Sequence, residues 1–129
     1  MRPAIINVMD KAARRAGRDL ARDFGEVEQL QVSRKGAADF VSAADTRSEE
    51  TLHYHLMKAR PDFGFLGEES GLKEEGDGVH RWIVDPLDGT TNFLHGLPNF
   101  AISIALEERG QIVAGVVYEP LNDELYWAE

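Results

Sequence analysis

The sequence predicts an α+β fold in which two helices pack on a largely antiparallel sheet. Three observations predict it: an amphipathic pattern of helical period near the N-terminus, a second helical segment before Pro61, and short apolar segments separated by turn-forming residues in the second half. The chain has 129 residues and is 43% hydrophobic. That length and composition suit one domain with one core.

The first half of the chain is predicted to be helical. Over residues 3–24, apolar residues recur at helical spacing between charged ones, and Gly25 is expected to end this helix. The segment LQVSRKG, residues 30–36, is expected to be a short strand that runs into a basic loop. A second helix is expected to begin near residues 44–45 and to end before Pro61, because the residue before proline avoids helical angles.

The second half of the chain is predicted to form strands. FGFL (63–66) and RWIVD (81–85) are short and apolar, and the polar, glycine-containing segment 71–80 between them is expected to be a loop. Residues 100–129 are expected to form three strands. The turns between these strands are expected at residues 108–110 and at EPLND, where proline, asparagine and aspartate favour a turn.

Cysteine content, hydropathy and charge exclude several kinds of protein. The chain has no cysteine, which excludes disulfides and thiolate chemistry and favours a cytoplasmic setting. It shows neither a signal peptide nor an apolar run near the roughly 20 residues that span a bilayer. The formal net charge of −9 makes nucleic acid an unlikely partner. An anionic phosphate substrate would therefore need metal cations at its site.

The stretch WIVDPLDGTTNF, residues 82–93, is the strongest indication of chemistry. Asp85 and Asp88 follow an apolar strand, and Pro86 favours a tight turn that could bring both carboxylates and the Leu87 carbonyl to one side. Such oxygens suit Mg²⁺, and the N–H groups that follow, at the start of a short helix, suit phosphate. A turn in which Asp88 caps the helix explains the same residues equally well.

Two further acidic positions follow apolar segments. Glu68 and Glu69 are neighbours at a strand end and should point to opposite faces, so at most one is expected to reach a shared ligand. Taken alone, this pair is better explained as the start of a solvated loop, and Asp45 as a helix cap. If these carboxylates and those of Asp85 and Asp88 converge, they raise one another's pKa values unless Mg²⁺ binds among them.

The histidines and the large aromatic residues carry no expected chemistry. His53 and His55 lie two residues apart on a predicted helix and face different directions, so surface positions are expected. Trp82, Phe93 and Phe100 are expected to lie in the core.

The acidic motifs resemble those of the inositol monophosphatase family. GEES (67–70) and WIVDPLDGTTNFLHGLP (82–98) match its two metal-binding signatures, and DFVSAADTRSEE (39–50) matches its upstream acidic motif, in the same order and spacing. The match covers only the N-terminal half of the family's usual protein. The resemblance implies that residues 1–129 are an N-terminal metal- and phosphate-binding domain of a layered α/β sandwich, without its C-terminal domain.

The resemblance also implies metal ligands. Glu68, Asp85 and the Leu87 carbonyl would bind the first Mg²⁺, and Asp85 and Asp88 would bind the second, in a site of two or three ions. Lys35 would belong to a mobile loop at the active site.

The remaining matched residues would act on the substrate and the water. Glu68 and Thr90 would position and deprotonate the attacking water, and the N–H groups of Gly89 and Thr90 would bind the phosphate. Asp45, near the Thr90 hydroxyl, and Glu69 would support them.

The implied function is that of a cytoplasmic, homodimeric, Mg²⁺-dependent phosphatase. It would hydrolyse inositol monophosphate or a related sugar monophosphate by attack of a metal-activated water. The 129 residues alone lack one metal-binding aspartate and most contacts to the sugar, and can be inactive.

Two alternatives remain. One is a phosphatase for a bisphosphate, such as fructose bisphosphate or a 3′-phosphoadenosine nucleotide. The other is a non-catalytic module that binds partners, as some bacterial relatives resemble transcription-complex factors.

Overall fold

Two long helices precede a six-stranded sheet in the computed structural model, which describes residues 2–27 and 34–129. The helices are α1 (Ala4–Val27) and α2 (Arg34–Ala59), and a short helix, α3 (Thr90–Leu94), connects the third and fourth strands. The strands are β1 (Gly64–Gly67), β2 (Gly71–Glu74), β3 (His80–Asp88), β4 (Ala101–Glu108), β5 (Gln111–Glu119) and β6 (Glu124–Ala128).

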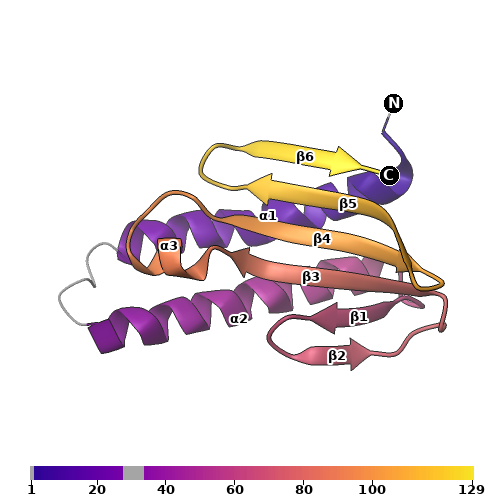
Figure 1. Ribbon diagram of the computed structural model, residues 1–129, viewed down its shortest axis with the longest axis horizontal. Helices are drawn as coiled ribbons and strands as arrows, with labels where there is room; N and C mark the ends of the chain where they lie inside the picture. The colour runs from indigo at the N-terminus through magenta and orange to yellow at the C-terminus, as the bar shows by residue number, and fades with distance from the viewer. Residues whose placement is uncertain (1, 28–33) are drawn as a thin grey trace.

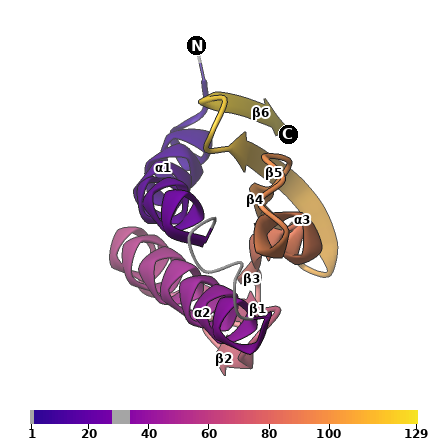
Figure 2. The same ribbon diagram turned by 90° about the vertical axis from the view of Figure 1, so that its left-hand side faces the viewer.

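The sheet is antiparallel except at one pair of strands. Its order is β2-β1-β3-β4-β5-β6, and only β1 and β3 run parallel among the described strands. Both long helices lie on one face of the sheet, and no other described element covers the opposite face (Figures 1 and 2). The predicted fold class, two helices on a largely antiparallel sheet, is confirmed.

The core lies between the helices and the inner face of the sheet. On β4, buried Ile102, Ile104 and Leu106 alternate with partly exposed residues, as expected for a strand with one face covered. The predicted core positions Trp82, Phe93 and Phe100 are at most 5% exposed. The rings of Phe93 and Phe100 also pack against Phe24, which fixes α3 against the end of α1.

Both long helices extend beyond their predicted bounds. Gly25 does not end α1, which continues to the fully buried Val27, and open space surrounds the position of a Cβ at Gly25. The predicted start of the second helix at residues 44–45 is wrong, because α2 begins at Arg34. The small residues of this stretch, buried Ala37 and Ala44 among them, allow close helix packing rather than interrupt the helix.

Two predicted connections also differ. Of the expected extended segment 30–36, residues 30–33 lie outside the described part of the chain, and residues 34–36 are helical. The polar segment 71–80 is not wholly a loop, because Gly71–Glu74 form β2 and pair with β1. Polar side chains fit there because β2 is an edge strand whose side chains are largely exposed.

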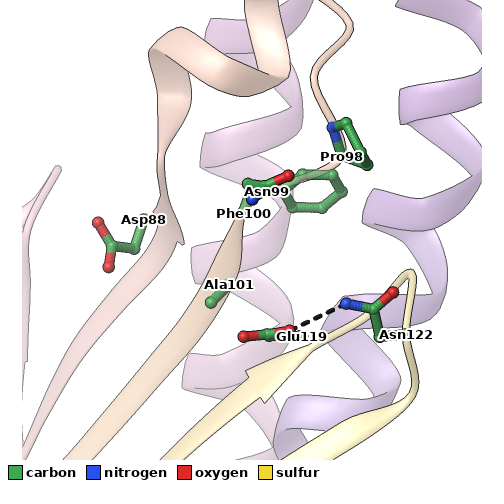
Figure 3. A pocket seen from close by; sticks show the side chains of 7 residues that line it. All are labelled: Asp88, Pro98, Asn99, Phe100, Ala101, Glu119 and Asn122. Carbon is green, nitrogen blue, oxygen red and sulfur yellow. Dashed lines mark hydrogen bonds between the residues drawn. The ribbon is translucent and has the colours of Figure 1, made fainter.

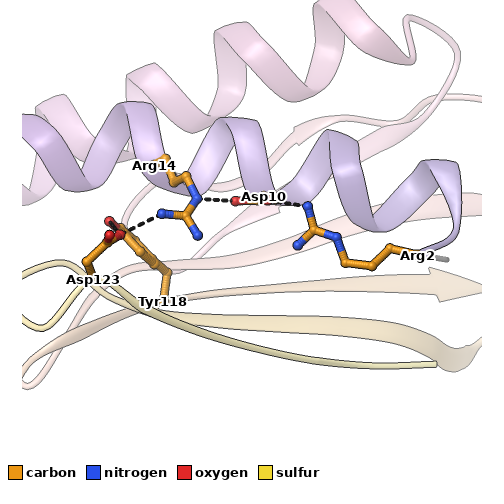
Figure 4. Close-up of polar contacts among 5 residues, drawn as sticks. All are labelled: Arg2, Asp10, Arg14, Tyr118 and Asp123. Carbon is orange, nitrogen blue, oxygen red and sulfur yellow. Dashed lines mark hydrogen bonds and ion pairs between the residues drawn. The ribbon is translucent and has the colours of Figure 1, made fainter.

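An ion-pair chain attaches α1 to the turn between β5 and β6. Arg2 and Arg14 both donate to buried Asp10, at 2.6 and 2.5 Å. Arg14 also donates to Asp123 at 2.6 Å, and the Tyr118 hydroxyl donates to the same carboxylate at 2.9 Å (Figure 4). These contacts connect residues 2–14 to residues 118–123.

No described helix is both long enough and apolar enough to cross a membrane.

Candidate metal and phosphate site

The parallel pairing of β1 with β3 brings two acidic motifs to one edge of the sheet. Gly67 pairs with Val84, and the N–H of Glu68 then donates to the Val84 carbonyl at 3.2 Å. Because parallel strands end at the same edge, Glu68 lies beside Asp85. The two carboxyl groups are close enough to share a hydrogen bond.

Pro86 lies where the ladder between β3 and β4 is interrupted, between Asp85 and Asp88. The Asp85 carboxylate accepts the Leu87 N–H at 3.2 Å, which closes a turn around the proline. The hydroxyl of Ser48 on α2 donates to the Pro86 carbonyl at 2.8 Å. The predicted tight turn is therefore present, with Leu87 buried and Asp88 exposed.

Gly89 joins this turn to α3. Its φ of 94° lies in the left-handed region, and a Cβ there would lie 2.9 Å from the Asn99 carbonyl oxygen. Glycine is therefore required for both its conformation and its space. Thr90 is the first residue of α3, so the N–H groups of both residues lie at a helix start, as predicted.

Helix α2 contacts the β1–β2 turn through two acidic residues one helical turn apart. Glu49 accepts the backbone N–H of Glu69 at 3.1 Å. The Asp45 and Glu69 carboxyl groups lie close enough to each other for a hydrogen bond between them. Both α2 residues are buried, with 6% of Asp45 and 3% of Glu49 exposed. Neighbouring Glu68 and Glu69 thus have different partners, as the strand geometry predicts.

The crowding of carboxyl groups shifts two pKa values upward. Burial raises the pKa of Asp45 to about 8, helped by the hydrogen bond to Glu69 and the charges of Glu69, Asp85 and Glu68. The pKa of Glu68 is raised to about 7, chiefly by its hydrogen bond to Asp85 and the charge of that group. Such shifts indicate that the site holds more negative charge than its own surroundings neutralise.

The donor atoms of this site are of the chemical type that a hard cation such as Mg²⁺ binds. They are carboxylate oxygens plus a nearby backbone carbonyl, and one buried oxygen, Oδ1 of Asp45, has no hydrogen-bond partner among the residues that the structure describes. The carboxyl groups meet in two pairs, Glu68 with Asp85 and Asp45 with Glu69. Among the described residues, no three His, Asp or Glu side chains already converge as a metal centre would require.

Cavities flank the end of β3 on two sides. One of about 420 Å³ lies on the uncovered face of the sheet, where Glu68 and Asp85 border apolar residues of β1, β3 and β4. Another of about 180 Å³ lies between the start of β4 and the β5–β6 turn. Figure 3 shows Glu119 and Asn122 joined there by a hydrogen bond, while the Asp88 carboxylate points away from them.

Not every predicted residue joins this cluster. Asp45 lies within α2 rather than at its start, so it is not a helix cap, and in the described structure it makes no hydrogen bond with Thr90. Lys35, expected in a mobile loop, lies in the first turn of α2. Ser48 and Glu49 were not predicted from the sequence. The signal for Glu49 was its position four residues after Asp45, which places both on one helix face.

The histidines occupy structural positions. His53 on α2 contacts Glu74 at 3.1 Å and packs edge-on against Phe65. His55, on another side of α2, is partly exposed. The two residues therefore face different directions, as expected.

Comparisons with known proteins agree with the predicted resemblance. A sequence profile of the inositol monophosphatase family matches residues 2–129. The chain is 62% identical to an inositol-1-monophosphatase of Rhizobium meliloti (strain 1021) over 99% of its own length and 48% of that protein. It is 43% identical to a Nus factor SuhB of Xylella fastidiosa (strain Temecula1 / ATCC 700964), over 99% of this chain and 46% of that protein.

A solved structure shows the same fold. The crystal structure of the extragenic suppressor protein suhB from Bartonella henselae superimposes with a TM-score of 0.86 at 56% identity. The overlap covers 98% of this chain and 48% of that one. The chain thus spans about half the length of the relatives it matches. On the strength of the profile match and these identities, the chain belongs to the inositol monophosphatase family.

Proposed function

We propose that the protein to which these residues belong is a Mg²⁺-dependent phosphoric monoester hydrolase acting on inositol monophosphate or a related sugar monophosphate. One observation carries the proposal: two pairs of carboxyl groups, Glu68 with Asp85 and Asp45 of α2 with Glu69, gather where β1 ends beside β3, and the pKa values of Asp45 and Glu68 are raised. Anionic groups gathered this closely are stabilised when cations bind among them. Membership of the inositol monophosphatase family supports the same chemistry.

The metal-binding residues in this proposal are those at the end of β3 and after β1. Glu68, Asp85 and the Leu87 carbonyl would hold one Mg²⁺, and Asp85 and Asp88 a second, in a site of two or three ions. When bound, the ions would acidify a water molecule and neutralise charge on the phosphoryl oxygens.

The other residues would bind and orient the reactants. The N–H groups of Gly89 and Thr90, at the start of α3, would donate to the phosphate oxygens. The Thr90 hydroxyl would orient the attacking water, and the Glu68 carboxylate would accept its proton. Asp45 and Glu69 would keep the surrounding carboxyl groups in place.

The proposal extends to the setting of the enzyme. Residues 1–129 would be its N-terminal metal- and phosphate-binding domain, and a further domain would complete the substrate site. The complete enzyme would be a cytoplasmic homodimer acting on a small phosphorylated molecule, and the absence of cysteine in these residues fits the cytoplasmic setting alone.

Phosphate release from inositol 1-phosphate by the complete protein tests the proposal. With Mg²⁺, wild-type protein should release phosphate, and chelation of the metal should stop it. Asp85→Asn should reduce kcat/KM by about 10²-fold or more, because it replaces a charged ligand with a neutral one. Asp62→Asn is the matched control, since Asp62 is exposed and lies before β1. Equal rates for wild type and Asp85→Asn would refute the proposed role of Asp85.

A second candidate function follows from the relatives named Nus factor SuhB, of which one is 43% identical to this chain. In that case the protein would bind partners in a transcription complex without needing catalysis. Capture of transcription-complex proteins by wild type and Asp85→Asn alike, together with no phosphate release from sugar monophosphates, would favour this function over the first.

A further inference from the structure

We infer that Glu49 is a positioning residue of the proposed metal site: it holds the β1–β2 turn on α2 so that Glu68 is directed to Asp85. The inference rests on the proposed function, because it explains how the proposed metal ligand Glu68 is oriented. Glu49 itself would bind neither metal nor substrate.

The contact of Glu49 is specific and shielded from water. Its Oε1 accepts the Glu69 N–H at 3.1 Å, and only 3% of the residue is exposed. A hydrogen bond to a buried, charged acceptor is stronger than one at the surface, and its loss leaves a buried group unpaired. The bond holds the backbone of Glu69, immediately after Glu68, rather than a side chain that could turn away.

Gly67 fits the same arrangement. A Cβ at Gly67 would overlap the Glu49 carboxylate, so the residue before Glu68 has room for glycine alone while Glu49 stays in place. The Glu49 carboxylate therefore packs directly against the last residue of β1. One side chain of α2 thus contacts the GEES motif at two points, the Cα of Gly67 and the N–H of Glu69.

The direction of Glu68 follows from this contact. Its own N–H is bonded to Val84 in β3, and the next N–H, of Glu69, is bonded to Glu49 on α2. Successive N–H groups are thus held on opposite sides, by the sheet and by the helix. With the backbone fixed at both points, the Glu68 side chain faces Asp85 and the Glu69 side chain faces Asp45.

The test compares three variants of the complete protein. Glu49→Ala removes the acceptor, Glu49→Gln keeps one acceptor oxygen in the same place, and Glu50→Ala is the matched control. Glu50 is the next residue of α2, is exposed, and makes no hydrogen bond or ion pair in the described structure. The measurements are direct Mn²⁺ binding by calorimetry, the Mg²⁺ concentration for half-maximal activity, kcat and KM for inositol 1-phosphate, and Tm.

The expected result is a selective loss in Glu49→Ala. Its Mn²⁺ affinity and kcat should fall by roughly 10- to 100-fold, the range seen when a residue that orients a metal ligand is removed. KM for inositol 1-phosphate should change little. Glu49→Gln should stay within about threefold of wild type, and Glu50→Ala should match it. A Glu49→Ala protein with wild-type Mn²⁺ affinity, or a Glu49→Gln protein as defective as Glu49→Ala, would overturn the inference.

A second pair of variants tests the contact without reference to metal. Gly67→Ala should lower Tm in the wild-type background, where its methyl group overlaps the Glu49 carboxylate. In the Glu49→Ala background the same change should lower Tm much less, because the space is free. Equal Tm losses in both backgrounds would contradict the contact, even if Glu49→Ala alone proved too unstable for kinetics.

Failure of this inference can be told apart from failure of the proposed function. Mn²⁺ binding that weakens in Glu49→Ala, in a protein that releases no phosphate, would support the positioning role and refute the phosphatase. Phosphate release that is unaffected in Glu49→Ala would support the phosphatase and refute the positioning role. A wild-type protein that neither binds Mn²⁺ nor releases phosphate would refute both.

Discussion

Gly89 holds the turn before α3 in a conformation and a space that suit glycine alone. With φ at 94° and the Asn99 carbonyl 2.9 Å from a Cβ, Gly89→Ala combines backbone strain with a steric overlap. We predict a loss of about 1–3 kcal/mol in the free energy of unfolding, measured with urea. Gly78→Ala separates the two causes, because Gly78 has φ of 76° but open space around it. A Gly89→Ala loss no larger than that of Gly78→Ala would show that the Asn99 contact is unimportant.

Individual residues of the site were predictable where each follows an apolar strand. The sequence places Asp85, Asp88 and Glu68 at strand ends. In the structure Glu68 directly follows β1, Asp88 is the last residue of β3, and Asp85 lies where the pairing of β3 with β4 is interrupted. Glu49 was not predictable in the same way, because its role depends on the distance between α2 and the β1–β2 turn. A helix surface carries many acidic residues, and only tertiary packing distinguishes buried Glu49 from exposed Glu50.

At the scale of elements, Asp10 holds the Arg14 guanidinium, and Arg14 in turn attaches α1 to the β5–β6 turn through Asp123. Burial acts to raise its pKa, but hydrogen bonds and charges from Arg2 and Arg14 outweigh burial and lower the pKa below 3.8. A group with a lowered pKa in the folded state stabilises the protein above the unfolded pKa, and this contribution is lost as the pH falls through the folded pKa.

We therefore predict that Asp10→Asn lowers the free energy of unfolding at pH 7 by about 1–3 kcal/mol, the range for hydrogen bonds to charged groups. The difference from wild type should shrink as the pH falls below 3.8, where Asp10 itself becomes protonated. Asp39→Asn, on the exposed side of α2, should have little effect. Chemical unfolding across this pH range measures both variants. A difference that stays constant down to the lowest pH would contradict the ionic role of Asp10.

Most element types were predictable, but β2 and two helix bounds were not. The strands β3 to β6 and the end of α2 before Pro61 follow local patterns of apolar residues and turn formers. The start of α2 at Arg34 was not predicted, although the alanines at residues 37–44 have high helix propensity. The mixed order of small, polar and apolar residues there hides the helical period, and buried Val41 and Ala44 show which side packs on the core.

For the whole molecule, the uncovered face of the sheet exposes apolar side chains to water. It carries Val117 and Tyr126, paired across β5 and β6 and 40% and 54% exposed, beside the apolar cavity that Glu68 and Asp85 border. A protein rarely leaves one face of a sheet this apolar in contact with water. We predict that the remainder of the complete protein covers this face.

Val117→Lys tests that prediction. In the 129-residue chain the new lysine would reach water, so the change in Tm should be small. In the complete protein it would be buried and unpaired, and Tm should fall sharply. A fluorescent dye that binds apolar surfaces should also bind the 129-residue chain more strongly than the complete protein. Similar effects in both proteins would mean that the face stays exposed.

We propose that the carboxyl groups of Glu68, Asp85 and Asp88 form a site for divalent cations. Mn²⁺ binding to the complete protein, measured by calorimetry for wild type and Asp85→Asn, tests it most directly. Two or more ions should bind each wild-type chain, and Asp85→Asn should lose at least one, because Asp85 is proposed to bind both metals. No saturable binding by wild type, or the same number and affinity of ions in Asp85→Asn, would contradict the claim.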